Sequence, residues 1–122
     1  VFQSEVLFDS ASAELNPQGL EQMAKLAKTL IEIAGKIPSD LKWILRVDGH
    51  TDKVPIRTVQ FPSNWELSTA RATSVVKFLI AQGVPAERLA ATGFGEFQPL
   101  DTNDDEIALR RNRRIELKLT ER

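Results

Sequence analysis

The spacing of apolar residues predicts two long helices. Over residues 17–34 the apolar side chains lie three and four positions apart, which is the spacing of one helix face. The preceding Asn16 is typical of a helix start, because its side chain can cap free backbone amides. The same spacing returns over residues 64–82, and Gly83 ends this second helix.

Four segments have the patterns of strands. Residues 43–48 and 114–120 alternate apolar and polar side chains, as a strand with one buried face does. Residues 1–8 and 89–92 are two further predicted strands, and 104–111 is a short polar helix. In the last strand, Ile115, Leu117 and Leu119 are expected to face the core, and Arg114, Glu116 and Lys118 to face outward.

The order βαβαβ(α)β predicts the fold class. It is expected to be α/β (α+β), a two-layer sandwich with helices packed on a mixed, roughly four-stranded sheet. The 122 residues, 42% of them hydrophobic, have the size of one compact domain. We find no internal repeat or linker, so residues 1–122 are predicted to form a single domain.

The nearly balanced charge argues against a partner that is attracted by the net charge of the protein. Sixteen basic and seventeen acidic residues leave a net charge of -1, so neither nucleic acid nor an anionic membrane is an expected partner. The basic residues at 110–114 follow the acidic side chains of 101–106, which neutralise them. No apolar run is long enough to span a bilayer. Because the chain begins with Val1, we expect a fragment whose targeting or anchoring part is missing.

Metal and catalytic chemistry have few candidates. The absence of cysteine removes disulfides, thiolate ligands and cysteine nucleophiles. Asp48, His50 and Asp52 form a possible metal group, but it lacks a fourth ligand, so no metal and no cofactor is expected. With a single histidine the chain offers few general bases. A carboxylate pair for glycan hydrolysis, Asp48 with Asp52, is a weaker interpretation than a binding module.

A charged pair near the second helix is the best candidate binding site. Thr51 and Asp52 follow the strand that ends near residue 48, while Ser68 and Arg71 share one face of the helix. If the loop folds back, a carboxylate and a guanidinium face one concavity at a helix amino terminus. Such a site suits a ligand with both an ammonium and a carboxylate group. The alternative is a salt bridge that only pins the loop to the helix.

Two aromatic residues near this loop have two interpretations. Phe61 and Trp65 could form a platform on which a sugar ring stacks. Aromatic side chains beside a proline-containing loop more often pack on the core, and packing is the expectation for Trp65.

Ordered motifs over nearly the whole chain are similar to one known family. Gly49-His50-Thr51-Asp52, Asn64-Trp65-Glu66-Leu67-Ser68 and Ala70-Arg71-Ala72 resemble the signature of OmpA-like peptidoglycan-binding domains. The insertion at 54–63 resembles the version in flagellar stator MotB proteins. Further matches are Leu7-Phe8-Asp9-Ser10, Leu15-Asn16-Pro17, Gly83 with Arg88, Gly93-Phe94-Gly95 with Pro99, and Asn112-Arg113-Arg114-Ile115-Glu116.

The resemblance implies a ligand and roles for individual residues. The ligand is the meso-diaminopimelate of the peptidoglycan stem peptide, with Asp52 on its ammonium and Arg71 on its carboxylate. Other positions that match ligand-contacting positions of the family are Thr51, Asn64, Leu67, Phe8, Asp9 through its backbone amide, and Arg114, with Arg113 as the alternative. Lys53 departs from the family pattern, and its ammonium could compete for Asp52.

The resemblance also implies where the parent protein works. It would be a periplasmic, non-enzymatic anchor, held in the inner membrane by a missing amino-terminal segment and commonly a homodimer. A stator or stator-like protein is favoured, and a general outer-membrane tether of the OmpA type is the alternative.

Overall fold

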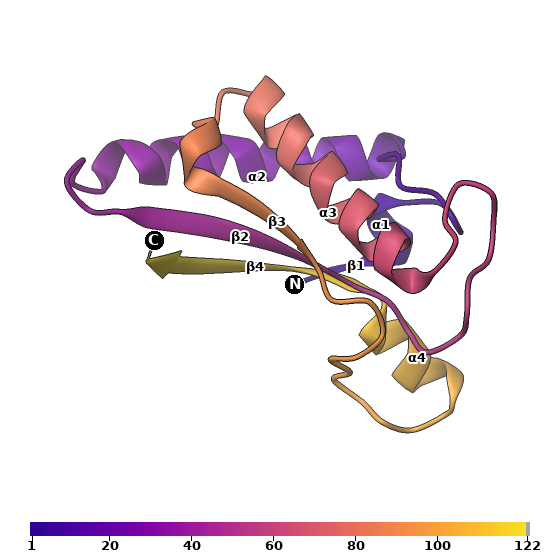
Figure 1. Ribbon diagram of the computed structural model, residues 1–122. Helices are drawn as coiled ribbons and strands as arrows, with labels where there is room; N and C mark the ends of the chain where they lie inside the picture. The colour runs from indigo at the N-terminus through magenta and orange to yellow at the C-terminus, as the bar shows by residue number, and fades with distance from the viewer. Residues whose placement is uncertain (122) are drawn as a thin grey trace.

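The computed structural model describes residues 1–121 and confirms the predicted two-layer architecture (Figure 1). In chain order the elements are β1 (Phe2–Gln3), α1 (Ser4–Leu7), α2 (Pro17–Lys36), β2 (Trp43–His50), α3 (Asn64–Ala81), the 3₁₀ turn η1 (Ala86–Arg88), β3 (Leu89–Gly93), α4 (Glu106–Asn112) and β4 (Arg114–Glu121). The strand order is β1-β4-β2-β3. Strand β2 is parallel to β3 and antiparallel to β4, so the sheet is mixed.

The two long helices begin where their caps place them. The Asn16 side chain accepts a hydrogen bond of 2.7 Å from the amide of Gly19, with Pro17 at the first helical position of α2. The Ser63 hydroxyl accepts one of 3.2 Å from the amide of Trp65, so α3 begins at Asn64. Both predicted long helices are therefore confirmed.

The predicted first strand is wrong for most of its length. Only Phe2–Gln3 pairs with β4, and the chain then turns into α1, where the amide of Ser4 donates to the carbonyl of Arg113 at 2.9 Å. Ser4 and Leu7 are buried and three residues apart, so this short segment buries side chains at helical rather than strand spacing. Residues 1–8 contain too few apolar positions to distinguish the spacing of a helix from that of a strand.

The burial of β4 also differs from the alternation that its sequence predicts. Ile115 is buried and Leu117 packs partly against the core, but Leu119 is 61% exposed. Arg114, expected to face outward, is 3% exposed. The core is centred on the first half of β4, and the loop before α4 covers Arg114 from the other side of the sheet, where the carbonyl of Gln98 accepts from its guanidinium.

The core between the sheet and the helices brings β2 close to α3. Its buried residues are Leu7, Phe8, Met23, Ala27, Val47, Ala72, Val75, Leu79, Val84 and Ile115. At Gly49 a Cβ atom would lie only 2.2 Å from the carbonyl oxygen of Ser68, so glycine is required for this approach. The residues that follow β2 are thereby placed beside the amino-terminal half of α3.

No helix within residues 1–121 combines the length and the apolar composition needed to cross a membrane.

Candidate functional site

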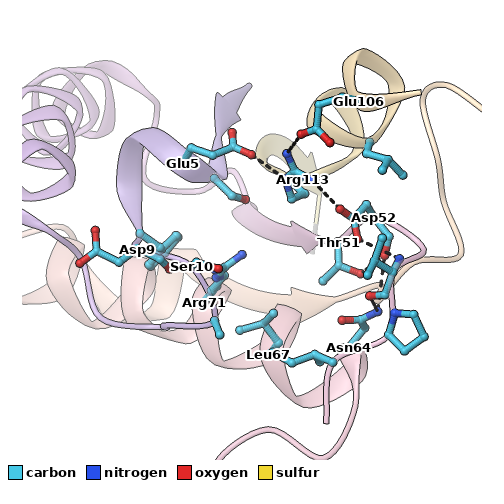
Figure 2. A pocket seen from close by; sticks show the side chains of 17 residues that line it. Glu5, Asp9, Ser10, Thr51, Asp52, Asn64, Leu67, Arg71, Glu106 and Arg113 are labelled. Carbon is cyan, nitrogen blue, oxygen red and sulfur yellow. Dashed lines mark hydrogen bonds and ion pairs between the residues drawn. The ribbon is translucent and has the colours of Figure 1, made fainter. Parts of the chain in front are cut away.

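A cavity of about 690 Å³ opens where β2, α1, α3 and α4 meet (Figure 2). Its lining residues come from segments far apart in the chain, and they are Ser4, Glu5, Phe8, Asp9, Ser10, Ala11, Thr51, Asp52, Val54, Pro55, Ile56, Asn64, Leu67, Arg71, Glu106, Leu109 and Arg113. Seven of the eight residues that the sequence singles out for ligand contact are among them. Folding therefore gathers nearly all of the predicted site around one concavity.

Arg71 is a buried cation that has no carboxylate partner among residues 1–121. Its Nε donates to the carbonyl of Ser12 at 2.8 Å, one Nη donates to the carbonyl of Asp9 at 3.3 Å, and its Cζ lies 5.1 Å from the centre of the Phe8 ring. Within residues 1–121 no carboxylate forms an ion pair with it, although its exposed fraction is 6%. Burial lowers the pKa of Arg71 to about 10. Its charge is therefore fixed in the cavity wall.

Asp52 lies across the cavity from Arg71 and is bonded to a different arginine (Figure 2). Its Oδ2 accepts from Arg113 at 2.6 Å, and its Oδ1 accepts from the amide of Val54 at 3.0 Å. Each carboxylate oxygen can accept two hydrogen bonds, so Asp52 keeps acceptor capacity for a further donor. The loop-pinning salt bridge between Asp52 and Arg71 is absent from the described structure.

Arg113 is held by three carboxylates at this end of the cavity. It donates to Glu5 at 2.5 Å and to Glu106 at 2.9 Å, in addition to Asp52. Burial opposes its charge, but the hydrogen bonds that it donates to these carboxylates dominate and raise the pKa of Arg113. Three carboxylates against one guanidinium leave two formal negative charges here, while Arg71 leaves one positive charge opposite. The cavity is therefore electrically bipolar.

The remaining predicted residues on the β2 and α3 side shape the wall. The Thr51 hydroxyl donates to the carbonyl of Asp52 at 2.8 Å, and the Asn64 amide donates to the carbonyl of Val54 at 3.1 Å. Leu67 is buried against Phe61 and Ala13 and supplies apolar surface. Polar side chains thus fix the loop after β2, and the same loop carries Asp52.

Phe8 and Asp9 border the cavity from the α1 side. The Phe8 ring lies under the guanidinium of Arg71 and is 2% exposed. Asp9 contributes its carbonyl to Arg71, and its carboxylate points away from the other labelled side chains (Figure 2). These two residues therefore orient Arg71, whereas a contact through the amide of Asp9 stays a prediction.

The structure corrects the placement of Arg114. It does not line the cavity but lies on the sheet face opposite α2 and α3, where it bonds to Glu116 and to the carbonyls of Asn112 and Gln98. Consecutive residues of a strand point to opposite faces. Because Arg113 precedes the strand at the end of α4, it is the arginine of the pair that reaches the cavity.

Sequence reasoning missed two carboxylates of this cavity and misjudged one lysine. Glu5 and Glu106 have no motif of their own, and only the fold brings them to Arg113. Lys53 forms its ion pair with Asp104 and not with Asp52. The sequence signal that could have identified this pairing is the acidic run before α4.

The sheet face opposite α2 and α3 forms a second charged cluster, which we call the charged face. It comprises Arg46, Asp48, His50, Arg114 and Glu116. Asp48 accepts two hydrogen bonds from Arg46, at 2.7 and 2.9 Å. His50 stacks on Phe94, and burial lowers the pKa of His50 to about 4. Among residues 1–121 no group of three potential ligands is placed to hold a metal ion.

The two aromatic residues beside the loop differ in burial. Phe61 is 4% exposed and packs in the small apolar cluster with Ala13 and Leu67. Trp65 is 50% exposed, so the expectation that it is packed in the core is wrong. Its ring stacks on that of Phe97, with 5.2 Å between the ring centres.

Comparison with known proteins gives a family and relatives. The chain matches the OmpA family over residues 7–113. Motility protein B of Bacillus subtilis (strain 168) is 32% identical over 113 residues, which are 92% of this chain and 41% of that protein. The chain spans less than half the length of the first curated relatives that it matches.

Solved structures of MotB-like and cell wall anchor proteins are also similar to this chain. A MotB-like protein from Desulfovibrio vulgaris has a TM-score of 0.86 and 32% identity, covering 98% of this chain and 70% of that one. The periplasmic domain of Helicobacter pylori MotB has a TM-score of 0.81 and 29% identity, covering 98% and 79%. The cell wall anchor of the T6SS from Pseudomonas aeruginosa has a TM-score of 0.82 and 34% identity, covering 98% and 77%. The resemblance predicted from the motifs is confirmed.

Proposed function

This chain belongs to the OmpA family, and from that premise we propose that it binds peptidoglycan non-covalently through the meso-diaminopimelate of the stem peptide. By that contact residues 1–122, acting as one binding domain, anchor a larger cell-envelope protein to the cell wall. The observation that carries the proposal is the buried guanidinium of Arg71, which faces a cavity of about 690 Å³ and has no carboxylate partner within residues 1–121.

The charges of the cavity match the end of a diaminopimelate side chain. That end carries an ammonium and a carboxylate on one carbon atom. The carboxylate bonds to Arg71, and the ammonium bonds to the free acceptor positions of Asp52, where Glu5 and Glu106 offset the charge of Arg113. Each charge-assisted hydrogen bond contributes about 1.5 to 3 kcal/mol.

The other lining residues position the ligand. Thr51, Asn64 and Leu67 form the wall between the two charged ends, and Phe8 supports Arg71 from below. The amide of Asp9 bonds to the ligand carboxylate. Arg113 keeps Asp52 oriented through their 2.6 Å bond, and it takes the place in the cavity that was first assigned to Arg114.

The same geometry favours recognition without turnover. The chain has one histidine and no cysteine, and His50 lies on the charged face, outside the cavity lining. The carboxylate of Asp52 already accepts a hydrogen bond from Arg113. Purified sacculi incubated with the protein are expected to release no muropeptide, and released muropeptide would establish a wall-modifying enzyme.

The relatives support a periplasmic location and an anchored parent. The solved neighbours include a MotB periplasmic domain and a cell wall anchor. We favour a stator or stator-like parent, held in the inner membrane and paired as a homodimer, because the insertion after Asp52 has the MotB pattern and its Val54, Pro55 and Ile56 line the cavity. A general OmpA-type tether is the alternative, and the segment preceding this chain in the full-length protein would distinguish them.

The decisive experiment is calorimetric titration with two matched stem peptides. One ends in meso-diaminopimelate, and the other ends in lysine, whose side chain keeps the ammonium but lacks the carboxylate beside it. The protein is expected to bind the first about tenfold to hundredfold more tightly. Arg71→Met should remove this preference, whereas Asp52→Asn should weaken both peptides.

Two exposed positions supply matched controls for these charge changes. Arg110→Met and Asp40→Asn alter the same charges away from the cavity and should leave both affinities within twofold. If the folded protein binds neither peptide, the proposed function is wrong, and Asp52 with Arg71 becomes a purely structural arrangement.

A further inference from the structure

A pair of exposed aromatic rings is connected to the cavity lining through neighbouring residues. Trp65 is 50% and Phe97 is 58% exposed, yet the two rings stack with 24° between their planes. Trp65 directly follows Asn64, which lines the cavity. We call Trp65 and Phe97 the aromatic pair.

The turn that packs against the aromatic pair is hydrogen-bonded to the cavity wall. The turn before Phe97 contains Gly95, with φ of 62°, whose carbonyl accepts from the amide of Thr51 at 2.9 Å and whose amide donates to the hydroxyl of Ser68 at 3.0 Å. A Cβ atom at Gly95 would lie 3.4 Å from the Trp65 ring, so the turn packs directly against it.

Polar groups surround the rings. Next to Trp65 a shallow hollow is lined by Glu66, Thr69 and Ala70. On the cavity side, the Glu96 carboxylate accepts from the Asn64 amide at 3.5 Å. An apolar ring face with hydroxyl and carboxylate groups at its edge offers stacking and hydrogen bonding together.

This combination fits the face of a sugar. The axial C–H groups of a pyranose ring form an apolar surface with a partial positive charge, and the face of an aromatic ring carries a partial negative charge. The hydroxyl and N-acetyl groups at the edge of the sugar need hydrogen-bond partners, which the rim of the hollow supplies. A protein partner would be expected to cover the apolar rings without needing this rim.

We propose that the aromatic pair is a glycan subsite, on which an amino sugar of the peptidoglycan strand stacks while its stem peptide occupies the cavity. The inference rests on the proposed function, because the stem peptide is covalently joined to a sugar of the strand and brings that sugar to the edge of the cavity. Peptidoglycan is then recognised at two continuous sites, one for the charged peptide end and one for the carbohydrate.

The first test compares the free diaminopimelate tripeptide with the same tripeptide attached to its disaccharide. The disaccharide form should bind about tenfold more tightly. Trp65→Ala and Phe97→Ala should each remove this gain and leave the affinity for the free tripeptide within twofold. Val59→Ala is the matched control, because it truncates a fully exposed apolar side chain outside the aromatic pair, and it should keep the gain.

The second test uses peptide-free glycan strands and monitors the indole N–H signals by nuclear magnetic resonance. The strands should shift the signal of Trp65 and leave that of Trp43, which is 9% exposed, in place. Equal affinity for the two tripeptide forms together with an unmoved Trp65 signal would overturn the subsite. A Trp65 signal that shifts with protein concentration alone would also overturn it and would indicate self-association.

The two proposals can fail separately. If the free tripeptide does not bind but the glycan strands shift Trp65, the diaminopimelate assignment is wrong and the glycan subsite stands. If the tripeptide binds, the disaccharide adds no affinity and the strands leave the Trp65 signal in place, the glycan subsite is wrong and the diaminopimelate assignment stands.

Discussion

The cavity and the charged face lie on opposite sides of the end of β2, and each contains a buried arginine. On the charged face, the guanidinium of Arg114 bonds to the Glu116 carboxylate and to two backbone carbonyls. In the cavity, Arg71 bonds to two carbonyls but to no carboxylate of residues 1–121. Arg71 also faces a cavity of about 690 Å³, whose lining does not include Arg114.

The difference teaches how a buried charge can be interpreted. A cation with an internal anion is satisfied within the fold, so removing the cation leaves that anion unpaired and destabilises the protein. A cation that is desolvated without an anion costs free energy, which the binding of an external anion offsets. Burial alone does not separate the two cases, because Arg71 and Arg114 are 6% and 3% exposed.

The largest expected effect is the loss of stability when Arg114 is truncated. Arg114→Met should lower the free energy of unfolding by about 3 to 5 kcal/mol, because it leaves the partly buried Glu116 carboxylate without its arginine. Urea denaturation measures the change. Arg110→Met, at an exposed position, serves as the reference and should stay within about 0.5 kcal/mol. A loss below about 1 kcal/mol would mean that the pairing on the charged face is not structural.

Arg71→Met, unlike Arg114→Met, is expected to change ligand affinity and not stability. The free energy of unfolding should change by less than about 1 kcal/mol, because removing an unpaired buried charge offsets the lost hydrogen bonds to Ser12 and Asp9. The affinity for the diaminopimelate peptide should fall by about a hundredfold. Urea denaturation and calorimetry on the same sample measure both quantities. A large loss of stability would place Arg71 in the same class as Arg114.

Acid should weaken the charged face through His50. Burial lowers the pKa of His50 to about 4 from its ordinary 6.5. Between these values the unfolded chain binds a proton that the folded protein does not, so stability falls as the pH drops below about 6.5. The loss attributable to His50 should reach at most about 2 kcal/mol at pH 5.

The control for His50 is a variant without a titrating ring. His50→Gln should flatten the stability profile between pH 6.5 and 5, where Glu116 contributes little because its ordinary pKa of 4.5 and its lower pKa in the folded protein both lie below this range. An unchanged slope in this variant would assign the pH dependence to another group.

The smallest effect is expected at Lys53. Lys53→Gln should change the free energy of unfolding by less than about 0.5 kcal/mol and the peptide affinity by less than twofold, because its exposed side chain pairs with Asp104. Calorimetry with the diaminopimelate peptide tests this. An increase of tenfold in affinity would show that Lys53 competes for Asp52 in solution.

The local elements of the fold were predictable because short-range chemistry determines them. Asn16 before Pro17 caps α2, and the alternation from Trp43 to Asp48 predicts β2. The strand prediction failed for residues 1–8, where Ser4–Leu7 forms a helix of only four residues. It also failed for Leu119 and Arg114, because alternation predicts which side a residue faces but not what covers that side.

By itself, the sequence determined the two long helices, the short helix α4, most strands, the family motifs and the presence of Asp52 and Arg71 near one helix start. Spacing and caps act over a few residues and can be interpreted along the chain. Only the tertiary structure decided that Asp52 bonds to Arg113, that Glu5 and Glu106 join them, and that Arg71 has no carboxylate partner in the part of the chain described. These pairings join residues up to 108 positions apart, and charge complementarity in the sequence does not specify which groups the packing of α1, α4 and β2 brings together.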